Sequence, residues 1–209
     1  MRKVYSLLCM VAISSFFLSP AFSAETSTVQ AKRFVEEVGQ KIVTLIASPK
    51  LTPLQKEEQF RTILEKSFDL PSIGRFVLGR YWRMANTQER EEYINLFEDV
   101  VVKTYASQFD DYHNETLKVV GAFEGKDGGI TVQSKVIRPS NQPLSVDWKV
   151  YNIKGEYRVL DIIVNGVSMS ISQRSEYAAL IRQQGGQIKS LLDAMRAQAS
   201  GNKKALKRA

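Results

Sequence analysis

Cysteine and histidine are almost absent from this chain, which has 209 residues and one residue of each type. Cys9 lies in an apolar N-terminal stretch that we expect to be removed, so the rest of the chain has no thiol for a disulfide, a metal site or a nucleophile. His113 lies in a polar turn without a nucleophile nearby in sequence, so we expect it on the surface. A glycine-rich phosphate loop is missing as well. We therefore expect no catalytic residue, no metal site and no cofactor.

The chain also lacks a hydrophobic run long enough to cross a bilayer, which takes roughly 18 or more apolar residues. Its most apolar stretch, residues 4–18, contains three serines. This stretch follows a short basic start and precedes small residues, which is the pattern of a cleaved secretory signal peptide. Cleavage is expected after Ser23, because cleavage after Ala24 would place bulky Phe22 three positions before the cut. The chain then divides into a signal peptide, one domain and a basic, disordered tail, over residues 1–23, 24–200 and 201–209.

The charge balance is mildly basic. The whole chain carries a formal net charge of +7, and removal of Arg2 and Lys3 leaves 27 basic against 22 acidic side chains, a net charge of +5. No nucleic-acid-binding motif is recognised in the sequence, so we expect no nucleic-acid partner. A small positive charge suits acidic protein faces or anionic lipid head groups. The tail accounts for four of these charges, which are Lys203, Lys204, Lys207 and Arg208.

The first half of the chain has helical periodicity, with apolar residues three and four positions apart. Thr52 followed by Pro53 and Gln55 predicts a helix start with a capping box. A third helix is expected from Asp69 through Trp82, and Asn86 or Thr87 should cap a fourth. The apolar stripes of the first, second and fourth helices are Val35, Val38, Ile42 and Leu45; Phe60, Ile63, Leu64 and Phe68; and Tyr93, Phe97, Val100, Val101 and Tyr105.

The period changes to two from Leu117 onward, and short loops with glycine, asparagine or proline separate the alternating runs. This pattern predicts a four-stranded antiparallel meander over residues 117–123, 130–137, 144–151 and 157–164. Two closing helices follow, over 173–183 and 187–199, separated by a Gly-Gly pair that can end a helix in the left-handed conformation. The fold class is therefore α+β.

The predicted strands have one apolar face. Ile130, Val132, Ser134 and Val136 share a side of the second strand, and Val146, Trp148 and Val150 share a side of the third. In the fourth strand we expect Val159 and Ile163 on one side with Asp161 between them. From alternation alone, this face is most simply an ordinary packed core beneath the helices.

Several stretches occur in an informative order and spacing. They are Phe76 to Trp82, Met84 to Arg90, Asp147-Trp148, Leu160 to Ile163, Gly166 to Met169, and the helix from Gln173. Together they resemble the MlaC family. The chain is similar to these periplasmic phospholipid carriers of the maintenance-of-lipid-asymmetry pathway, which include toluene-tolerance proteins. The resemblance covers nearly all of the chain after the signal peptide.

The resemblance implies an NTF2-like fold around an apolar cavity, so that residues 24–200 form a lipid-binding domain. It also implies a soluble, monomeric periplasmic carrier, without enzymatic activity, that encloses the acyl chains of a phospholipid. Its partners would be an outer-membrane lipoprotein and porin complex and an inner-membrane ABC-type complex. The expected lining residues are Leu78, Tyr81, Phe97, Val101, Tyr105, Val132, Val136, Val146, Trp148, Val150, Val167 and Met169.

Other interpretations stay open from the sequence. The cargo can be a hopanoid or another long-chain lipid, and the apolar face can bind a protein segment as an adaptor would. NTF2-like cavities also host enzymes, in which Asp161, or secondarily Asp147, would act as a base with a pKa raised by burial. Arg80 and Tyr81 can contact a lipid phosphate, or instead pair with a carboxylate and pack in the core.

Overall fold

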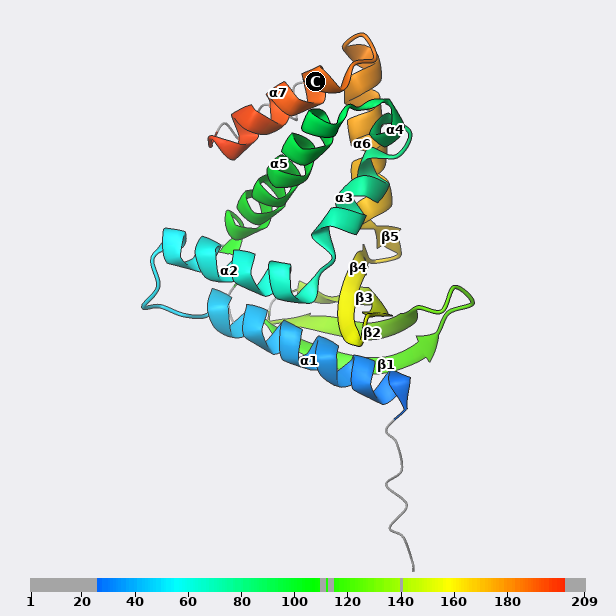
Figure 1. Cartoon of the computed structure of the whole chain (residues 1–209). Helices are drawn as coiled ribbons and strands as arrows, with labels where there is room; N and C mark the ends of the chain where they lie inside the picture. The colour runs from blue at the N-terminus through cyan, green and yellow to red at the C-terminus, as the bar shows by residue number, and fades with distance from the viewer. Residues whose placement is uncertain (1–25, 110–111, 113–114, 140, 202–209) are drawn as a thin grey trace, which may run out of the picture.

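The computed structural model describes residues 26–109, 112, 115–139 and 141–201 (Figure 1). The expected signal peptide, His113 and most of the basic tail lie outside the described residues. The elements are α1 (Ser27–Ile46), α2 (Pro53–Ser67), α3 (Leu70–Leu78), α4 (Tyr81–Met84), α5 (Thr87–Ala106), β1 (Thr116–Glu124), β2 (Ile130–Arg138), β3 (Asn141–Ile153), β4 (Glu156–Val164), β5 (Val167–Ser168), α6 (Met169–Gln183) and α7 (Ile188–Ala199).

The strands form one antiparallel sheet in the order β1-β2-β3-β4-β5, which confirms the α+β fold class and the meander. Two details of the prediction are wrong. A fifth, two-residue strand pairs with the end of β4. β3 begins at Asn141 instead of Leu144 and so includes Pro143, which lies at the irregularity between Val136 and Arg138 in the β2–β3 register. Strands tolerate proline, which has no N–H group, at such irregularities.

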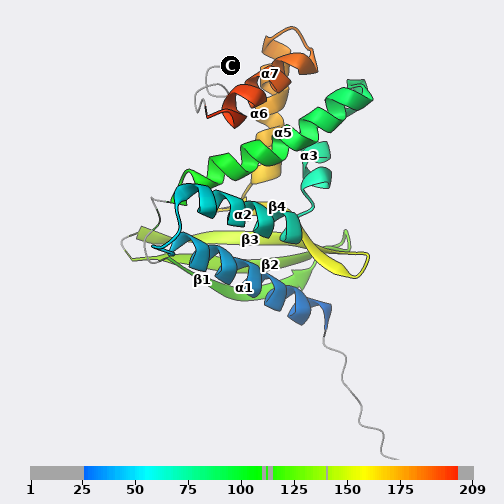
Figure 2. The same ribbon diagram turned by 60° about the vertical axis from the view of Figure 1, so that its left-hand side comes forward.

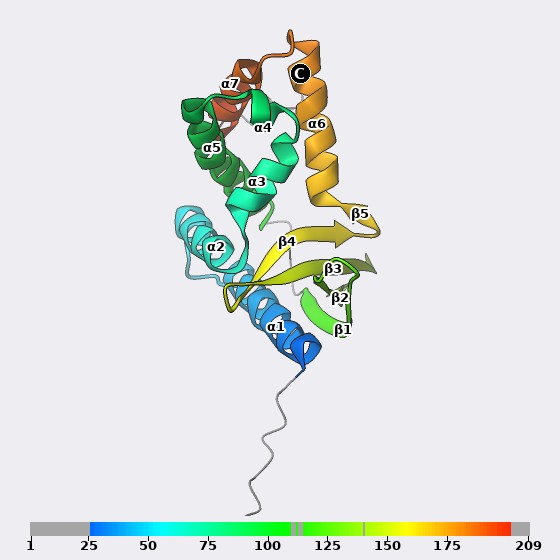
Figure 3. The same ribbon diagram turned by 45° about the vertical axis from the view of Figure 1, so that its right-hand side comes forward.

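The helices divide into two sets around the sheet. α1 runs across one face of the sheet and contacts β1 and β2, and α2 lies beside α1 (Figures 1 and 2). α3 to α7 form a second body on the other side of α2, and α6 rises from β5 at the sheet edge (Figure 3). α2, α3 and α6 each contact β4, so this strand joins the two parts of the molecule.

A bulge in β4 makes the prediction that Val159 and Ile163 share one face of the sheet wrong. Val159 pairs with Val150, whereas Asp161 pairs with Lys149 and Ile163 pairs with Asp147. Leu160 is therefore an extra residue that shifts the alternation, as bulges do. Val159 faces α1, while Asp161 and Ile163 lie on the opposite face of the sheet.

The predicted helix from Asp69 through Trp82 is broken into α3 and α4. Gly79 has φ 59° and ψ −125°, a conformation that side chains exclude and only glycine readily adopts. Apolar periodicity continues through this position, so periodicity alone does not reveal the break. The break places Arg80 at the N-cap of α4 and Trp82 within α4.

The helix starts follow the predicted capping chemistry. Thr52 accepts a hydrogen bond from the backbone N–H of Gln55 in a capping box, and Asn86 forms the same arrangement with Glu89. The side chain of Asp69 accepts a hydrogen bond from the backbone N–H of Ser72 at 3.1 Å. These bonds satisfy N–H groups that a helix start leaves without partners.

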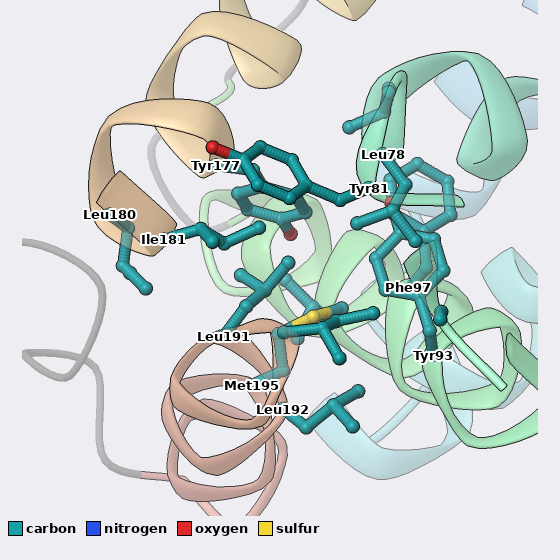
Figure 4. Close-up of a cluster of buried hydrophobic side chains, with 14 residues drawn as sticks. Leu78, Tyr81, Tyr93, Phe97, Tyr177, Leu180, Ile181, Leu191, Leu192 and Met195 are labelled. Atoms are coloured by element: carbon teal, nitrogen blue, oxygen red, sulfur yellow. The ribbon is translucent and has the colours of Figure 1, made fainter. Parts of the chain in front are cut away.

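Three groups of buried side chains hold the fold together. The sheet cluster joins α1 to the inner face of the sheet through Ala31, Val35, Val38, Ile130, Val132, Val146, Trp148, Val150 and Val159. The linking cluster, between α1, α2, α3 and α5, contains Leu45, Phe60, Leu64, Leu70, Val102 and Phe109. The helical cluster, shown in Figure 4, joins α3 to α7 and includes Leu78, Tyr81, Tyr93, Phe97, Tyr177, Ile181, Leu191 and Met195.

Candidate functional site

A pocket of about 960 Å³ opens at the seam between α1, α2 and β1. This volume lies at the upper end of the usual range for small-molecule sites. The floor of this seam pocket is apolar and consists of Leu45, Leu51, Ile63, Leu117 and Val119. Its rim is polar and carries both signs of charge, with Arg33, Glu36, Glu37, Gln40, Lys41, Thr44, Ser48, Gln59 and Lys118.

The floor of the seam pocket continues into the core of the protein. Ile63 packs against both the sheet cluster and the linking cluster, and Leu117 and Val119 pack against the sheet cluster. An apolar ligand that entered at the seam would therefore meet the inner face of the sheet. The pocket has the form suited to an amphiphile, with an apolar interior and a charged opening.

The close approach of α1 to β1 depends on a glycine. A Cβ atom at Gly39 would lie 2.5 Å from Cδ2 of Leu117, so a side chain at this position would press on the pocket floor. This pocket was not predicted from the sequence. A usable signal is present nonetheless, because a glycine inside the apolar stripe of a predicted helix marks a close packing contact.

Polar groups within the inner face of the sheet are paired with one another. The indole N–H of Trp148 donates to Oγ of Ser134 at 3.0 Å, and the Ser134 hydroxyl donates to the carbonyl of Val146 at 2.8 Å. Buried donors without partners would cost about 1–3 kcal/mol each. This pairing leaves an aliphatic and aromatic surface beneath α1.

The residues expected to line the cavity fall into three separate groups, and none of them lines the seam pocket. Val132, Val146, Trp148 and Val150 are buried in the sheet cluster, with the partly buried Val136 beside them. Leu78, Tyr81 and Phe97 are buried in the helical cluster, against which Val101 packs. The sheet residues and the helical residues belong to separate clusters of buried side chains, and their contact with a lipid stays a prediction.

The remaining expected lining residues lie near the surface. Val167 is 53% exposed and Tyr105 is 43% exposed. Met169 is half-buried at the first position of α6. The turn around Gly166 places Val167 in a two-residue strand that pairs with the end of β4.

Arg80 and Tyr81 contact one another. The guanidinium of Arg80 donates to the hydroxyl of Tyr81 at 3.1 Å and lies 5.0 Å from the centre of its ring. Tyr81 packs in the core, as one of the two interpretations expected, whereas Arg80 pairs with this phenol and not with a carboxylate in the described part of the chain. Arg80 also belongs to a second pocket of about 470 Å³, lined by Ser72, Arg75, Phe76, Gly79, Arg80, Trp82, Arg83 and Arg174.

Asp161 has a structural role at the start of α6. Its carboxylate accepts a hydrogen bond from the hydroxyl of Ser168 at 2.5 Å and another from the backbone N–H of Ser170 at 3.1 Å. Ser168 in turn caps α6 by accepting from the N–H of Ile171. The carboxylate therefore fixes α6 to the sheet, on the face opposite the sheet cluster.

The described ranges hold neither a metal site nor a membrane-spanning helix. No group of three or more histidine, cysteine, aspartate or glutamate side chains is arranged to hold a metal ion there. Within these same residues, no helix combines the length and hydrophobicity needed to span a bilayer.

The fold and the seam pocket define a binding protein in which helices cover an antiparallel sheet above an apolar floor. The model of the MlaC protein family matches residues 33–197, so the chain belongs to the MlaC family. This finding confirms the family expected from the sequence motifs.

Two curated proteins are similar to this chain in sequence, and one solved structure is similar in fold. The chain is 24% identical to the intermembrane phospholipid transport system binding protein MlaC of Haemophilus influenzae, over 96% of this chain and 94% of that protein. It is 23% identical to the toluene tolerance protein ttg2D of Pseudomonas putida, over 63% of this chain and 61% of that protein. The fold matches a phospholipid-binding protein from Ralstonia solanacearum that was solved in complex with a phospholipid. The TM-score is 0.73 and the sequence identity 18%, over 83% of this chain and 99% of that chain.

Proposed function

We propose that this protein is a soluble periplasmic carrier that encloses the acyl chains of a phospholipid and moves the lipid between membrane complexes. The observation that carries the proposal is the seam pocket, whose apolar floor continues into the inner face of the sheet. Membership of the MlaC family supports the same function. The Haemophilus relative is named as the binding protein of an intermembrane phospholipid transport system, and the Ralstonia protein holds a phospholipid.

Transport through water requires that both acyl chains be enclosed. A two-chain phospholipid has on the order of 30 methylene groups, and exposing each one costs about 0.8 kcal/mol. The total of roughly 24 kcal/mol makes free diffusion between membranes extremely rare. A carrier must therefore offer an apolar interior of comparable extent, while the head group can stay in water.

The seam gives a route to such an interior. Side chains of α1, including Val35 and Val38, cover Val132 and Trp148 on the sheet. Separation of α1 from the sheet at the seam would convert these packed contacts into the walls of a cavity that begins at the existing pocket. The mixed charges of the rim would then lie at the level of the head group. In this scheme the predicted lining residues of the sheet contact lipid only in the loaded protein.

The helical cluster is a less suitable place for the chains. It is closely packed between α3, α5, α6 and α7, and Tyr93 within it donates a hydrogen bond to the carbonyl of Gly74 at 3.0 Å. We assign Leu78, Tyr81 and Phe97 to a supporting role that keeps α5 and α6 in place. Engagement of Asp161 at the start of α6 supports a carrier without enzymatic chemistry.

Partners follow from the proposed route. A carrier that works between two membranes collects lipid at one and releases it at the other, so we propose docking to an inner-membrane ABC-type complex and an outer-membrane lipoprotein and porin complex. The expected N-terminal signal peptide is consistent with a periplasmic location.

A transfer assay tests the proposal. Delipidated protein is incubated with donor vesicles that carry a fluorescent phospholipid, separated by gel filtration, and mixed with acceptor vesicles. We expect the label to elute with the protein and then to appear in the acceptor vesicles. Label that never leaves the donor vesicles, with folded protein shown by circular dichroism, would contradict the carrier function.

A further inference from the structure

The second pocket concentrates positive charge on one surface of the helical body. Arg75 of α3, Arg80 and Arg83 at α4, and Arg174 of α6 line it, and no acidic side chain does. We call it the arginine pocket. Within the described residues, none of these four arginines takes part in a salt bridge, whereas Arg61, Arg158 and Arg196 each pair with carboxylates.

Aromatic rings replace carboxylates as the neighbours of these arginines. The guanidinium carbon of Arg174 lies 5.1 Å from the ring centre of Phe76, and that of Arg75 lies 5.8 Å from the ring centre of Trp82. Stacking of this kind positions a guanidinium while leaving its N–H edge free for an oxyanion. Four like charges around one concave surface repel each other, and a bound anion would offset that repulsion.

Glycine at the α3–α4 break makes room for this arrangement. A Cβ atom on Gly79 would lie 2.9 Å from Nε of Arg174. The bare backbone therefore lets the side chain of Arg174 cross from α6 onto α3 and close one side of the pocket. The three helices that meet here, α3, α4 and α6, lie together above the sheet (Figure 3).

Exposed apolar side chains lie in the pocket wall or close to its arginines in the sequence. Phe76 is 44% exposed and lies in the pocket wall, and Met84, next to Arg83, is 68% exposed. Ile171 is 57% exposed and lies one helical turn before Arg174 on α6, hence on the same side of the helix. Apolar side chains beside cations are typical of surfaces that lie in the head-group region of a membrane.

We propose that the arginine pocket docks the protein on a bilayer that contains anionic phospholipid, with a phosphate-bearing head group in the pocket and Phe76, Met84 and Ile171 in the interface. The proposal rests on the carrier function, because a carrier gains from being held where lipid is collected or released. An acidic protein face would match the charge, but a bilayer accounts for both the cations and the apolar side chains around them.

Co-sedimentation with vesicles tests the proposal. We expect the purified protein to bind vesicles of phosphatidylcholine mixed with phosphatidylglycerol, to release them as salt rises, and to bind pure phosphatidylcholine vesicles far more weakly. The double variant Arg83→Gln/Arg174→Gln should bind the anionic vesicles about 25-fold more weakly, because each cation near the surface contributes about fivefold.

A matched control removes the same charge elsewhere. Lys126 and Lys135 are exposed in the β1–β2 turn and on the outer face of β2, and Lys126→Gln/Lys135→Gln should leave most of the vesicle binding intact. Equal losses in the two double variants, or equal binding to both vesicle types, would overturn the proposal. Capture of a polyglutamate peptide by a protein that ignores anionic vesicles would overturn it as well.

Tryptophan emission gives a second readout. The variant Trp148→Phe leaves Trp82, in the pocket wall, as the only tryptophan of the chain. Its emission should shift to shorter wavelength on anionic vesicles, and an unchanged spectrum would count against docking through this pocket.

Solvent extraction of bound lipid separates the docking proposal from the carrier proposal. Loss of vesicle binding by wild-type protein that still carries lipid would overturn only the docking, whereas absence of lipid would overturn the carrier function.

Discussion

Gly39 of α1 and Leu117 of β1 are in such close contact that a Cβ atom on the glycine would lie 2.5 Å from Cδ2 of the leucine. Leu117 belongs to the floor of the seam pocket, so this contact lies where α1 meets the edge of the sheet. If acyl chains enter between α1 and the sheet, this contact must open. A covalent bond between these two positions would therefore block the proposed route of entry.

A disulfide between these positions should prevent loading. With Cys9 removed along with the expected signal peptide, Gly39→Cys/Leu117→Cys would hold the only two cysteines of the protein. We expect the oxidised protein to fold and to take up far less fluorescent phospholipid than the same protein after reduction, since the bridge holds α1 against β1. The reduced form is the matched control, and equal uptake in both redox states would show that the chains enter elsewhere.

A charge on the pocket floor should weaken lipid binding without unfolding the protein. Ile63 is half-buried in the seam pocket, and Thr62 is exposed on the same helix. Ile63→Asp places a carboxylate against the acyl chains, which costs several kcal/mol unless the charge is neutralised. Thr62→Asp adds the same charge outside the pocket. We expect solvent extraction to recover little lipid from the first variant and a normal amount from the second, and similar amounts from both would contradict the assignment of the floor.

Loss of the hydroxyl of Ser134 should destabilise the sheet. Ser134→Ala removes the acceptor of the indole N–H of Trp148. Because that donor is buried under α1, water cannot replace the lost acceptor. We expect the free energy of unfolding to fall by about 1–3 kcal/mol in urea titrations. Ser145→Ala removes a hydroxyl from an exposed position of the neighbouring strand and should have little effect. A Ser134→Ala protein as stable as wild type would mean that the indole finds another acceptor.

Removal of the hydroxyl of Tyr177 should instead stabilise the protein. This hydroxyl is buried in the helical cluster and has no hydrogen-bond partner among the described residues. Tyr177→Phe keeps the ring and is expected to raise the free energy of unfolding by about 1 kcal/mol. Tyr157→Phe is the contrasting control. It should lower the free energy of unfolding, because the Tyr157 hydroxyl donates a hydrogen bond to the carbonyl of Ser27 at 3.2 Å.

Tyr177 should also make the free energy of unfolding decrease at high pH. Burial raises the pKa of the Tyr177 phenol above its ordinary value near 10. Below about pH 10 the phenol is neutral in both the folded and the unfolded chain. As the pH rises further the unfolded chain ionises first, so the free energy of unfolding falls. In wild type the free energy of unfolding should decrease above pH 10, and the decrease should be smaller in Tyr177→Phe. Tyr151, whose pKa is raised to about 12 mainly by its hydrogen bond to Asp127, adds a similar decrease in both proteins.

Local chemistry made much of the fold predictable from the sequence. Thr52 and Asn86 cap their helices as expected, because capping depends on residues within a few positions of one another. Alternation correctly placed Val132 and Trp148 on the covered face. It failed after Leu160, where a bulge shifts the register of β4. Sequence period gives no sign of an inserted residue, so Ile163 was placed on the wrong face.

The site was harder to predict, because it depends on how separate elements pack. Leu45, Ile63 and Leu117 were recognised as apolar positions of different elements, but nothing local shows that they meet at one pocket. The break at Gly79 was missed for a related reason, since its conformation brings Arg174 of a distant helix against α3. Apolar periodicity identifies which residues are buried and does not identify their partners.

Native mass spectrometry of the protein purified from bacterial periplasm without detergent tests the central claim most directly. The carrier function predicts folded protein with an added mass that resolves, after solvent extraction, into phospholipids with mixed head groups. It also predicts that this added mass falls in Ile63→Asp and persists in Thr62→Asp. Wild-type protein that is folded and reproducibly without lipid would contradict the claim.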